Sequence, residues 1–349
     1  MPCMELYAPS FAERSRQDFV LGIKLLANGP MQDRVRAEGS GGALARTTAF
    51  RSWAALTHRS QTMMWDAIEP AAQRGAALAA RELAALAAQP ARHGSLELDP
   101  HLPIPEPIAS IEIHRQPGGY VADSGVHDTT AGLRYLGSSL IYSAGKGQKD
   151  VGTDARGRLL VDLARTRFPG LAPRRILELG CGIGIATQAI ALAFAGADYH
   201  ALDAAPGLLR FAHLLAERRG VPVHFHQRDA AQTRFPDGHF DLIVSNIFFH
   251  ETGEVKVAEI LRECRRVLAR GGAMLHLDVA NQRDRTGPAD RAMNDWQVQW
   301  NGEPFWSGFG ATDMRAALVA AGFARDASFA EHIAKQGGLG AWYVFGARG

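Results

Sequence analysis

Three acidic residues recur at nearly constant spacing in the second half of the chain, each beside a short apolar segment. Glu178 lies within the segment 175–179, Asp203 follows 25 residues later, and Asp229 comes 26 residues after Asp203. A carboxylate accepts hydrogen bonds from hydroxyl and amino groups and attracts a cation. If the apolar segments are parallel strands, these acids lie at one edge of a sheet, where such sheets bind ligands.

A glycine-rich turn directly follows the first acid. Gly180, Gly182 and Gly184 allow the backbone to turn sharply and to approach a ligand closely. Their spacing does not fit the G-x-G-x-x-G dinucleotide fingerprint in either register. Glu178 would also repel a pyrophosphate, whereas it would favour the ammonium or sulfonium charge of S-adenosylmethionine. The turn therefore indicates a cationic nucleotide ligand.

The composition is that of an ordinary globular protein. Of the 349 residues, 46% are hydrophobic and 21% are charged, and the formal net charge is only +2. These values exclude collagen-like and disordered classes. The N-terminus lacks the basic start and apolar core of a signal peptide, and no apolar run approaches the length of a membrane span. We expect a cytoplasmic protein with neither a membrane nor a nucleic-acid partner.

Cysteine and histidine spacing argues against a metal centre. The three cysteines are widely separated and contain no C-x-x-C pattern. His224 and His226 share one face of a predicted strand, and His276 and Asp278 end another. These residues do not form a compact ligand set, so we expect no catalytic metal.

Residue patterning divides the chain into two regions. Residues 1–157 begin with helical periodicity that reaches about residue 88, and we predict a mainly helical cap that serves substrate binding and dimerisation. The Asn-Gly-Pro sequence at residues 28–30 is predicted to be a turn between helices, and residues 111–114 are a candidate strand. Residues 158–349 are predicted to form the cofactor-binding domain.

In the second region, short apolar segments alternate with helix-length segments. This alternation predicts an α/β fold in which parallel strands form one sheet. The predicted strands are residues 175–179, 198–202, 222–226, 240–245, 272–278, 324–329 and 341–347. An aromatic insertion at 279–310, which carries Trp296, Phe305 and Trp306, is too long for an ordinary connection and is a candidate lid.

The ordered motifs resemble those of the class I S-adenosylmethionine-dependent methyltransferases, from about residue 174 to the C-terminus. Glu178-Leu-Gly-Cys-Gly-Ile-Gly resembles the first motif, Ala201-Leu-Asp203 the second, Arg228-Asp229-Ala230 the third and residues 240–246 the fourth. The resemblance implies a Rossmann-like, mostly parallel sheet of seven strands whose last strand is antiparallel. It also implies S-adenosylmethionine as methyl donor and S-adenosylhomocysteine as product.

The same resemblance implies the residues that hold the cofactor. Asp203 can accept both ribose hydroxyls, and Asp229 can accept the adenine amino group. Asn246 directly follows the fourth strand. The full predicted cofactor set is Glu178, Gly180, Gly182, Gly184, Asp203, Asp229, Ala230 and Asn246.

His250 and Glu251 follow the fourth strand, where the methyl acceptor is expected. In related small-molecule O-methyltransferases, a His-Asp pair supplies the general base at the corresponding place. A histidine with a pKa near neutrality could take a hydroxyl proton while Glu251 orients it. The alternative is that His250 lines the pocket or donates a hydrogen bond to the substrate.

The segment before the cofactor domain is the predicted acceptor-binding region. It contains Tyr135, Tyr142, Lys146 and Lys149. A tyrosine hydroxyl beside a cation could bind a carboxylate-bearing substrate, although an ordinary surface of helices and loops would have the same composition. We single out Tyr142, and with His250 and Glu251 it completes the candidate catalytic set.

The sequence thus predicts a small-molecule methyltransferase that acts by in-line transfer. O-methylation is favoured, and S-, N- or C-methylation is left open. Two other classes are also left open: a non-catalytic S-adenosylmethionine-binding or assembly protein and, less favoured, a nicotinamide-dependent reductase. The helical N-terminal region is compatible with a homodimer.

Overall fold

A computed structural model of the chain describes residues 5–39, 43–89, 93–106, 108–146, 153–280, 287–335 and 340–349. Its strands are β1 Ser95–Glu97, β2 Arg175–Leu179, β3 Asp198–Asp203, β4 His224–Gln227, β5 Phe240–Asn246, β6 Leu268–Val279, β7 Ser328–Ala334 and β8 Ala341–Arg348. The described α-helices are α2 Phe11–Leu26, α3 Gln32–Ala37, α4 Thr48–Ala87, α5 Thr130–Gly145, α6 Ala155–Arg167, α7 Ile185–Ala193, α8 Pro206–Arg219, α9 Glu254–Val267, α10 Pro288–Trp300, α11 Trp306–Ala311 and α12 Met314–Ala320. Four short helical segments are η1 Ala27–Met31, η2 Leu44–Arg46, η3 Ile113–Arg115 and η4 Phe249–Glu251.

The strands form one eight-stranded sheet in the order β1-β4-β3-β2-β5-β6-β8-β7. The strands from β1 to β6 pair in parallel, whereas β8 pairs antiparallel with both β6 and β7. β2 lies near the middle, and Ile176, Leu177 and Leu179 in it are fully buried, as expected of a parallel strand covered on both faces. The predicted α/β fold class is confirmed.

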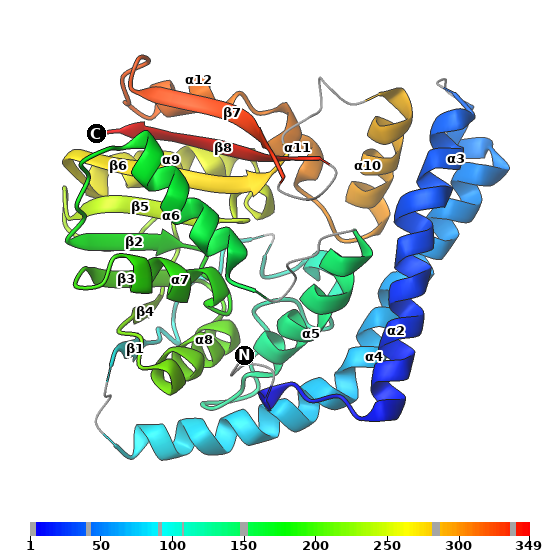
Figure 1. The fold of residues 1–349 in the computed structure, drawn as a ribbon, viewed down its shortest axis with the longest axis horizontal. Helices are drawn as coiled ribbons and strands as arrows, with labels where there is room; N and C mark the ends of the chain where they lie inside the picture. The colour runs from blue at the N-terminus through cyan, green and yellow to red at the C-terminus, as the bar shows by residue number, and fades with distance from the viewer. Residues whose placement is uncertain are drawn as a thin grey trace.

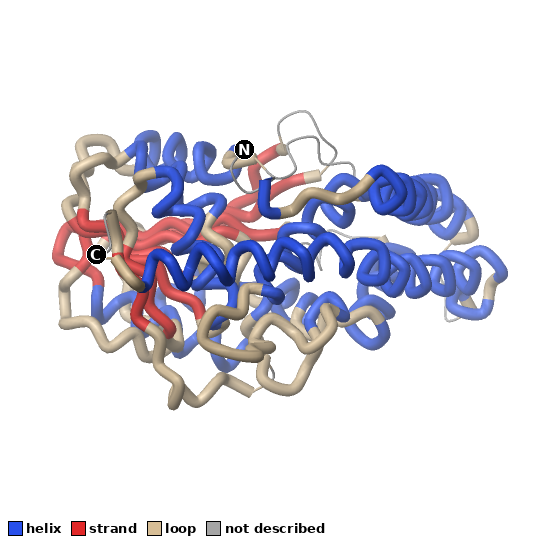
Figure 2. Tube along the Cα trace, turned by 90° about the horizontal axis from the view of Figure 1, so that it is seen from below, coloured by secondary structure: helices blue, strands red, loops and turns tan. Residues whose placement is uncertain are grey.

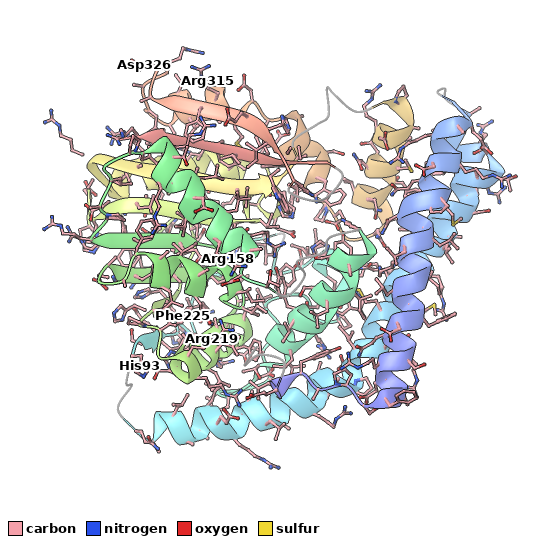
Figure 3. The ribbon with its side chains drawn as sticks, in the orientation of Figure 1. His93, Arg158, Arg219, Phe225, Arg315 and Asp326 are labelled. Atoms are coloured by element: carbon pink, nitrogen blue, oxygen red, sulfur yellow. The ribbon has the colours of Figure 1, made fainter. Side chains whose placement is uncertain are left out.

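Helices cover both faces of the sheet, which Figure 2 shows edge-on. One face packs against α6, α7 and α8, and Phe225 of β4, labelled in Figure 3, is fully buried in that core. The other face packs against α9, α11 and α12. A third core joins α2, α4 and α5 to α8, so the N-terminal helices are anchored to the sheet region.

The N-terminal helices stand beyond the carboxyl ends of the parallel strands (Figure 1). α2 begins at a capping box, in which the Glu13 backbone N–H donates to Ser10 Oγ and the Ser10 N–H donates to Glu13. α4 is continuous over 40 residues with Pro70 inside it, and it changes direction along its length (Figure 1), because an internal proline removes a helical hydrogen bond. α5 lies between these helices and the sheet (Figure 1).

Several local predictions were wrong. β1 adds an eighth strand to the seven expected, and its three residues are too few to give a sequence pattern. Residues 113–115 form the helical turn η3 rather than a strand. The Asn-Gly-Pro sequence lies within the π-helical segment η1, which joins α2 directly to α3, because Pro30 can end one hydrogen-bonding pattern without reversing the chain.

None of the described helices has the length and apolar character needed to cross a membrane. The cytoplasmic location, the division of the chain at residue 157, the lid role of 279–310 and the homodimer stay predictions. On α2, Phe11, Phe19 and Leu26 are exposed.

Candidate active site

The carboxyl ends of the central strands border a cavity of about 520 Å³, which we call the cofactor cavity. Five predicted cofactor residues line it: Gly180, Gly182, Asp203, Asp229 and Ala230. They come from the ends of β2, β3 and β4, so the parallel sheet brings separated motifs to one edge. The volume lies in the range of ~300–1,000 Å³ that is usual for small-molecule sites.

The turn after β2 depends on glycine at two positions that border the cavity. Gly180 has φ +61°, and a Cβ there would lie 2.1 Å from the Phe248 ring. Gly182 has φ +55°, and a Cβ there would meet nothing within 4 Å. The first glycine thus permits close packing, while the second leaves open space on the side of the cavity.

Asp203 fixes the same turn. The Gly182 N–H donates to Asp203 Oδ2 and the Ala205 N–H donates to Oδ1, each at 2.9 Å. Each carboxylate oxygen keeps a further lone pair. Burial raises the pKa of Asp203, although the hydrogen bonds from these backbone amides act to lower it.

Asp229 has a cationic partner. Lys256 Nζ lies 2.9 Å from Asp229 Oδ2, and the Ala231 N–H donates to Oδ1 at 2.8 Å. Lys256 also lines the cofactor cavity. An amino group that bonded to Asp229 would therefore share the carboxylate with Lys256.

The three other predicted cofactor residues lie outside the main cavity. Glu178 and Asn246 line a smaller neighbouring cavity of about 60 Å³. Glu178 accepts a hydrogen bond from Tyr199 at 2.9 Å, and burial raises the pKa of this carboxyl to about 7. Asn246 Oδ1 is buried without a partner among the described residues. Gly184 lines neither cavity: it begins α7, and its Cβ position lies 3.1 Å from Ala212.

A second cavity of about 250 Å³, which we call the acceptor cavity, lies beside the first. His114, Tyr120, Tyr135 and Ile247 line both cavities. The residues that line the acceptor cavity but not the cofactor cavity are Gln61, Met64, Trp65, Ser138, Ser139, Tyr142, Ser143, Lys146, Arg156, His250, Val279, Trp306, Lys335 and Trp342. The predicted residues His250 and Tyr142 therefore share this cavity.

His250 is 3% exposed and lies between two carboxylates. Its Nδ1 is 2.7 Å from Asp278 Oδ1, and its Nε2 is 3.3 Å from Glu251 Oε1. Asp278 is itself held by the backbone N–H groups of Phe249 and Val279. Burial alone would lower the pKa of His250, but Asp278 and Glu251 raise it well above its ordinary value.

The hydrogen bonds continue from Glu251 across the cavity wall. His114 donates from Nε2 to Glu251 at 3.2 Å and from Nδ1 to Glu303 at 2.7 Å. The Tyr142 hydroxyl donates to Glu303 at 2.6 Å and accepts from Lys146 Nζ at 2.6 Å. We call the chain Asp278, His250, Glu251, His114, Glu303, Tyr142 and Lys146 the charge network.

Charge alternates along this network. Burial opposes a charge on His114, yet Glu303 and Glu251 raise its pKa to about 9. With both histidines protonated, three cations balance three carboxylates, which is the condition for holding charges in a buried site. Both nitrogens of each imidazole then act as donors.

Ile247 stands where the two cavities meet, and its backbone is strained. Its φ is +56°, a value that is unfavourable for a β-branched residue. The Ile247 N–H donates to Leu277 O at 2.8 Å, which ties this conformation to β6. Such strain is typically retained at functional sites.

Several residues of this site had escaped the sequence analysis. Asp278 had been considered only as a metal ligand, whereas it is the partner of His250. His114, Glu303 and Arg156 had no motif to mark them, because their neighbours come from distant segments of the chain. Lys149 lies outside the described residues.

The aromatic insertion contributes to both cavities. Trp306 lines the acceptor cavity, and Phe305 lines the cofactor cavity. Trp296 packs on Trp53 of α4 with ring centroids 5.1 Å apart. The described part of the insertion is thus a wall of the site that is fastened to the helical region.

Comparison with known proteins places the cofactor motifs in one family. Residues 176–272 match the family model described as a methyltransferase domain. A demethylmenaquinone methyltransferase of Thermus thermophilus is 38% identical over 128 residues, which cover 36% of this chain and 56% of that protein. A malonyl-[acyl-carrier protein] O-methyltransferase of Halorhodospira halophila is 36% identical over 107 residues, covering 30% of this chain and 34% of that protein. The matches therefore span less than two thirds of either relative.

Among solved structures, an O-methyltransferase family protein from Burkholderia thailandensis is similar with a TM-score of 0.45 and 18% identity, over 68% of this chain and 63% of that one. The ordered acids, the glycine turn, the family match and the antiparallel β8 agree with one another. Residues 176–272 of this chain thus match a methyltransferase domain, and they carry the motifs expected of the class I S-adenosylmethionine-dependent methyltransferases.

Proposed function

We propose that the protein transfers the methyl group of S-adenosylmethionine to an oxygen atom of a small molecule bound in the acceptor cavity. The observation that carries this proposal is the contact between the two cavities. Four residues line both, and His250 and Tyr142 line the acceptor side. A donor on one side and an acceptor on the other would meet near Ile247.

The residues of the cofactor cavity fit S-adenosylmethionine. Gly182 leaves room for a ligand, and Asp203 has lone pairs for ribose hydroxyls. In the smaller neighbouring cavity, Glu178 has a carboxyl pKa raised to about 7 by burial, and a nearby cation would favour its ionised form. When bound, this cofactor supplies a methyl group on a positively charged sulfur.

The chain's main contribution to catalysis would be alignment in a site that excludes water. Tryptophan and tyrosine side chains contribute to the walls of the acceptor cavity, and the charge network fixes His250, His114 and Tyr142 by hydrogen bonds. These side chains need not reorganise when the acceptor binds. The acceptor oxygen would form its new bond to carbon while the carbon–sulfur bond breaks.

The role of His250 as a general base stays a prediction, and it requires that His250 first lose its own proton. Asp278 and Glu251 stabilise the imidazolium form, so His250 already holds a proton at neutral pH. His250 can accept the proton of an acceptor hydroxyl only after losing its own. An acceptor that arrives ionised needs no base, and then His250 would position it and favour its negative charge.

Oxygen is favoured over sulfur, nitrogen or carbon for two reasons. The site offers charged hydrogen-bond donors, which stabilise an oxygen anion. The malonyl-[acyl-carrier protein] relative is also named as an O-methyltransferase.

Cofactor binding and methyl transfer can be tested with a matched pair of glycine variants. Gly182 and Gly196 both have positive φ and open space at the Cβ position, but only Gly182 lines the cofactor cavity. Calorimetry should show that the wild type and Gly196→Leu bind S-adenosylhomocysteine, whereas Gly182→Leu does not. Incubation of a metabolite extract with methyl-labelled S-adenosylmethionine should then yield a labelled product only with the first two proteins.

Two results would contradict the proposal in different ways. If the wild type binds NAD but not S-adenosylhomocysteine, the cofactor assignment fails. If it binds S-adenosylhomocysteine and labels nothing in any extract, a non-catalytic binding protein is the better description.

A further inference from the structure

We propose that the acceptor is an aromatic acid, and that its anionic group binds at the lysine-bearing end of the acceptor cavity, away from the oxygen that is methylated. This inference rests on the proposed function and deepens it. It is argued from the charges, the aromatic walls and the position of the lysines within the cavity.

The acceptor cavity is lined by cations and by no carboxylate of the described residues. Lys146, Arg156 and Lys335 line it from three separate segments. Glu251 lines the cofactor cavity and Glu303 lines neither cavity, and both pair with histidines of the charge network. A ligand that enters the cavity therefore meets positive side chains directly and negative ones only through their partners.

Aromatic rings hold both lysines in place. Lys146 Nζ lies 4.1 Å from the centroid of the Tyr142 ring and 4.5 Å from that of Trp306. Lys335 Nζ lies 4.0 Å from the centroid of Trp342. Cation–π contacts of this kind fix the direction of an ammonium group. The two charges are thus presented to a ligand at little further cost in side-chain entropy.

These cations also repel one another. Burial and the like charge of Lys335 lower the pKa of Lys146. Lys24 is buried against the Tyr142 ring, and its Nζ donates a hydrogen bond to Gln61 at 2.7 Å. Burial and the charge of Lys146 lower the pKa of Lys24 to about 7. An anion between Lys146 and Lys335 would relieve this repulsion, since an opposite charge favours the protonated lysine.

The rest of the cavity suits a flat ring. Its aromatic lining residues are Trp65, Tyr120, Tyr135, Tyr142, Trp306 and Trp342. An apolar cavity of ~150 Å³ accommodates benzene, so the 250 Å³ found here admits one ring with substituents. Rings stack or meet edge to face at such walls.

The position of the lysines orients the acceptor. Lys146 and Lys335 line only the acceptor cavity, whereas Tyr135 and Ile247 also line the cofactor cavity. An acid group on the lysines would therefore point away from the methyl donor. A second substituent of the ring, an oxygen in the proposed function, would then lie toward Ile247.

Binding can be tested without knowing the natural acceptor. The probes are 4-hydroxybenzoate and 4-hydroxybenzamide, which have nearly the same shape and differ in charge. In the complex with S-adenosylhomocysteine, calorimetry should show at least about tenfold tighter binding of the acid, as expected for one charge-assisted contact. Equal affinity for the two probes, or binding of neither, would overturn the inference even if methyl transfer to some other acceptor is observed.

A charge variant locates the anion. Lys146→Met should remove the preference for the acid over the amide, while Lys146→Arg should retain most of it. Arg315→Gln removes one exposed positive charge from α12, a helix that lines neither cavity, and should change nothing. Unchanged affinity for S-adenosylhomocysteine shows that the variants are folded.

If Lys146→Met fails to fold, Lys335→Met provides the same test from the other wall. Turnover gives an independent readout: an extract is separated on an anion exchanger, and each fraction is incubated with methyl-labelled S-adenosylmethionine. Labelled products that contain an aromatic ring should come from the acidic fraction. Label found only in the neutral or basic fraction would reject an acidic acceptor while leaving methyl transfer intact.

Discussion

The cofactor cavity and the acceptor cavity touch each other, but the chain builds them in opposite ways. The cofactor cavity uses consecutive strand ends, in which Gly182, Asp203 and Asp229 follow one another along the sequence. The acceptor cavity collects His114 from η3, Lys146 from the residue after α5, and His250 from η4. These residues are joined through Glu251, the neighbour of His250, and through Glu303, which comes from the aromatic insertion.

The difference teaches where specificity resides. A parallel sheet places its strand ends together for any sequence that forms it, so the cofactor cavity follows from the topology. The acceptor cavity depends on particular long-range pairs, each of which fixes the next member of the charge network. A substitution that disrupts one cavity should therefore leave ligand binding in the other cavity nearly unchanged.

The largest effect is expected from Asp278→Ala. Asp278 is fully buried and balances the charge of His250. Breaking a buried ion pair from one side costs about 3–5 kcal/mol, and urea unfolding should show a loss of this size. Asp326→Ala, an exposed change at the edge labelled in Figure 3, is the control and should cost almost nothing.

The same variant tests whether the two cavities are independent of each other. If the cavities are separate, folded Asp278→Ala should bind S-adenosylhomocysteine with nearly wild-type affinity. A large loss of cofactor affinity would show that the charge network supports both cavities.

The reverse experiment is Asp203→Ala. Hydrogen bonds to a carboxylate contribute about 1.5–3 kcal/mol, so losing the proposed ribose contacts should weaken S-adenosylhomocysteine binding by roughly 100-fold in calorimetry. Asp237 is 81% exposed, and Asp237→Ala is the matched control. Affinity within a fewfold of the wild type would remove Asp203 from the cofactor site.

The same contrast explains what could be predicted from the sequence. Strand periodicity and the position of each acid predicted β2 at its observed bounds and brought Gly180, Asp203 and Asp229 to one cavity. These signals are local in the sequence, and the parallel sheet brings the residues that carry them next to one another.

The acceptor side offers no such local signal. His114 adopts φ +52° and reaches Glu303, which lies 189 residues later in the chain. No periodicity or spacing rule records a pair of that kind, because only the packing of η3 against the aromatic insertion creates it. Tyr142, His250 and Glu251 were identified individually, but His114 and Glu303, which connect Glu251 to Tyr142, were not.

A pH experiment tests whether His114 is charged. Its folded pKa is raised from 6.5 to about 9, so the associated stability is fully present below pH 6.5 and is lost as the pH rises through 9. The unfolding free energy of the wild type relative to His114→Gln should fall by about 2–3 kcal/mol across this window.

The comparison with the variant is needed because another group acts in the opposite direction. Lys24 has its pKa lowered to about 7, so its contribution to stability increases as the pH rises above that value. Subtracting the His114→Gln curve removes this background. A difference that does not change between pH 6.5 and 9 would mean that His114 is neutral in the folded protein.

The smallest effect is expected where the two cavities meet. Ile247 has φ +56°, which costs a residue with a Cβ roughly 1 kcal/mol and a glycine almost nothing. Ile247→Gly should therefore be more stable than Ile247→Ala by about that amount in urea unfolding. Ile243 is buried in β5, which ends directly before Ile247, and it has no positive φ, so there glycine should be the less stable replacement. If glycine is also the worse choice at position 247, the junction is unstrained, and the two cavities meet at an ordinary packing contact.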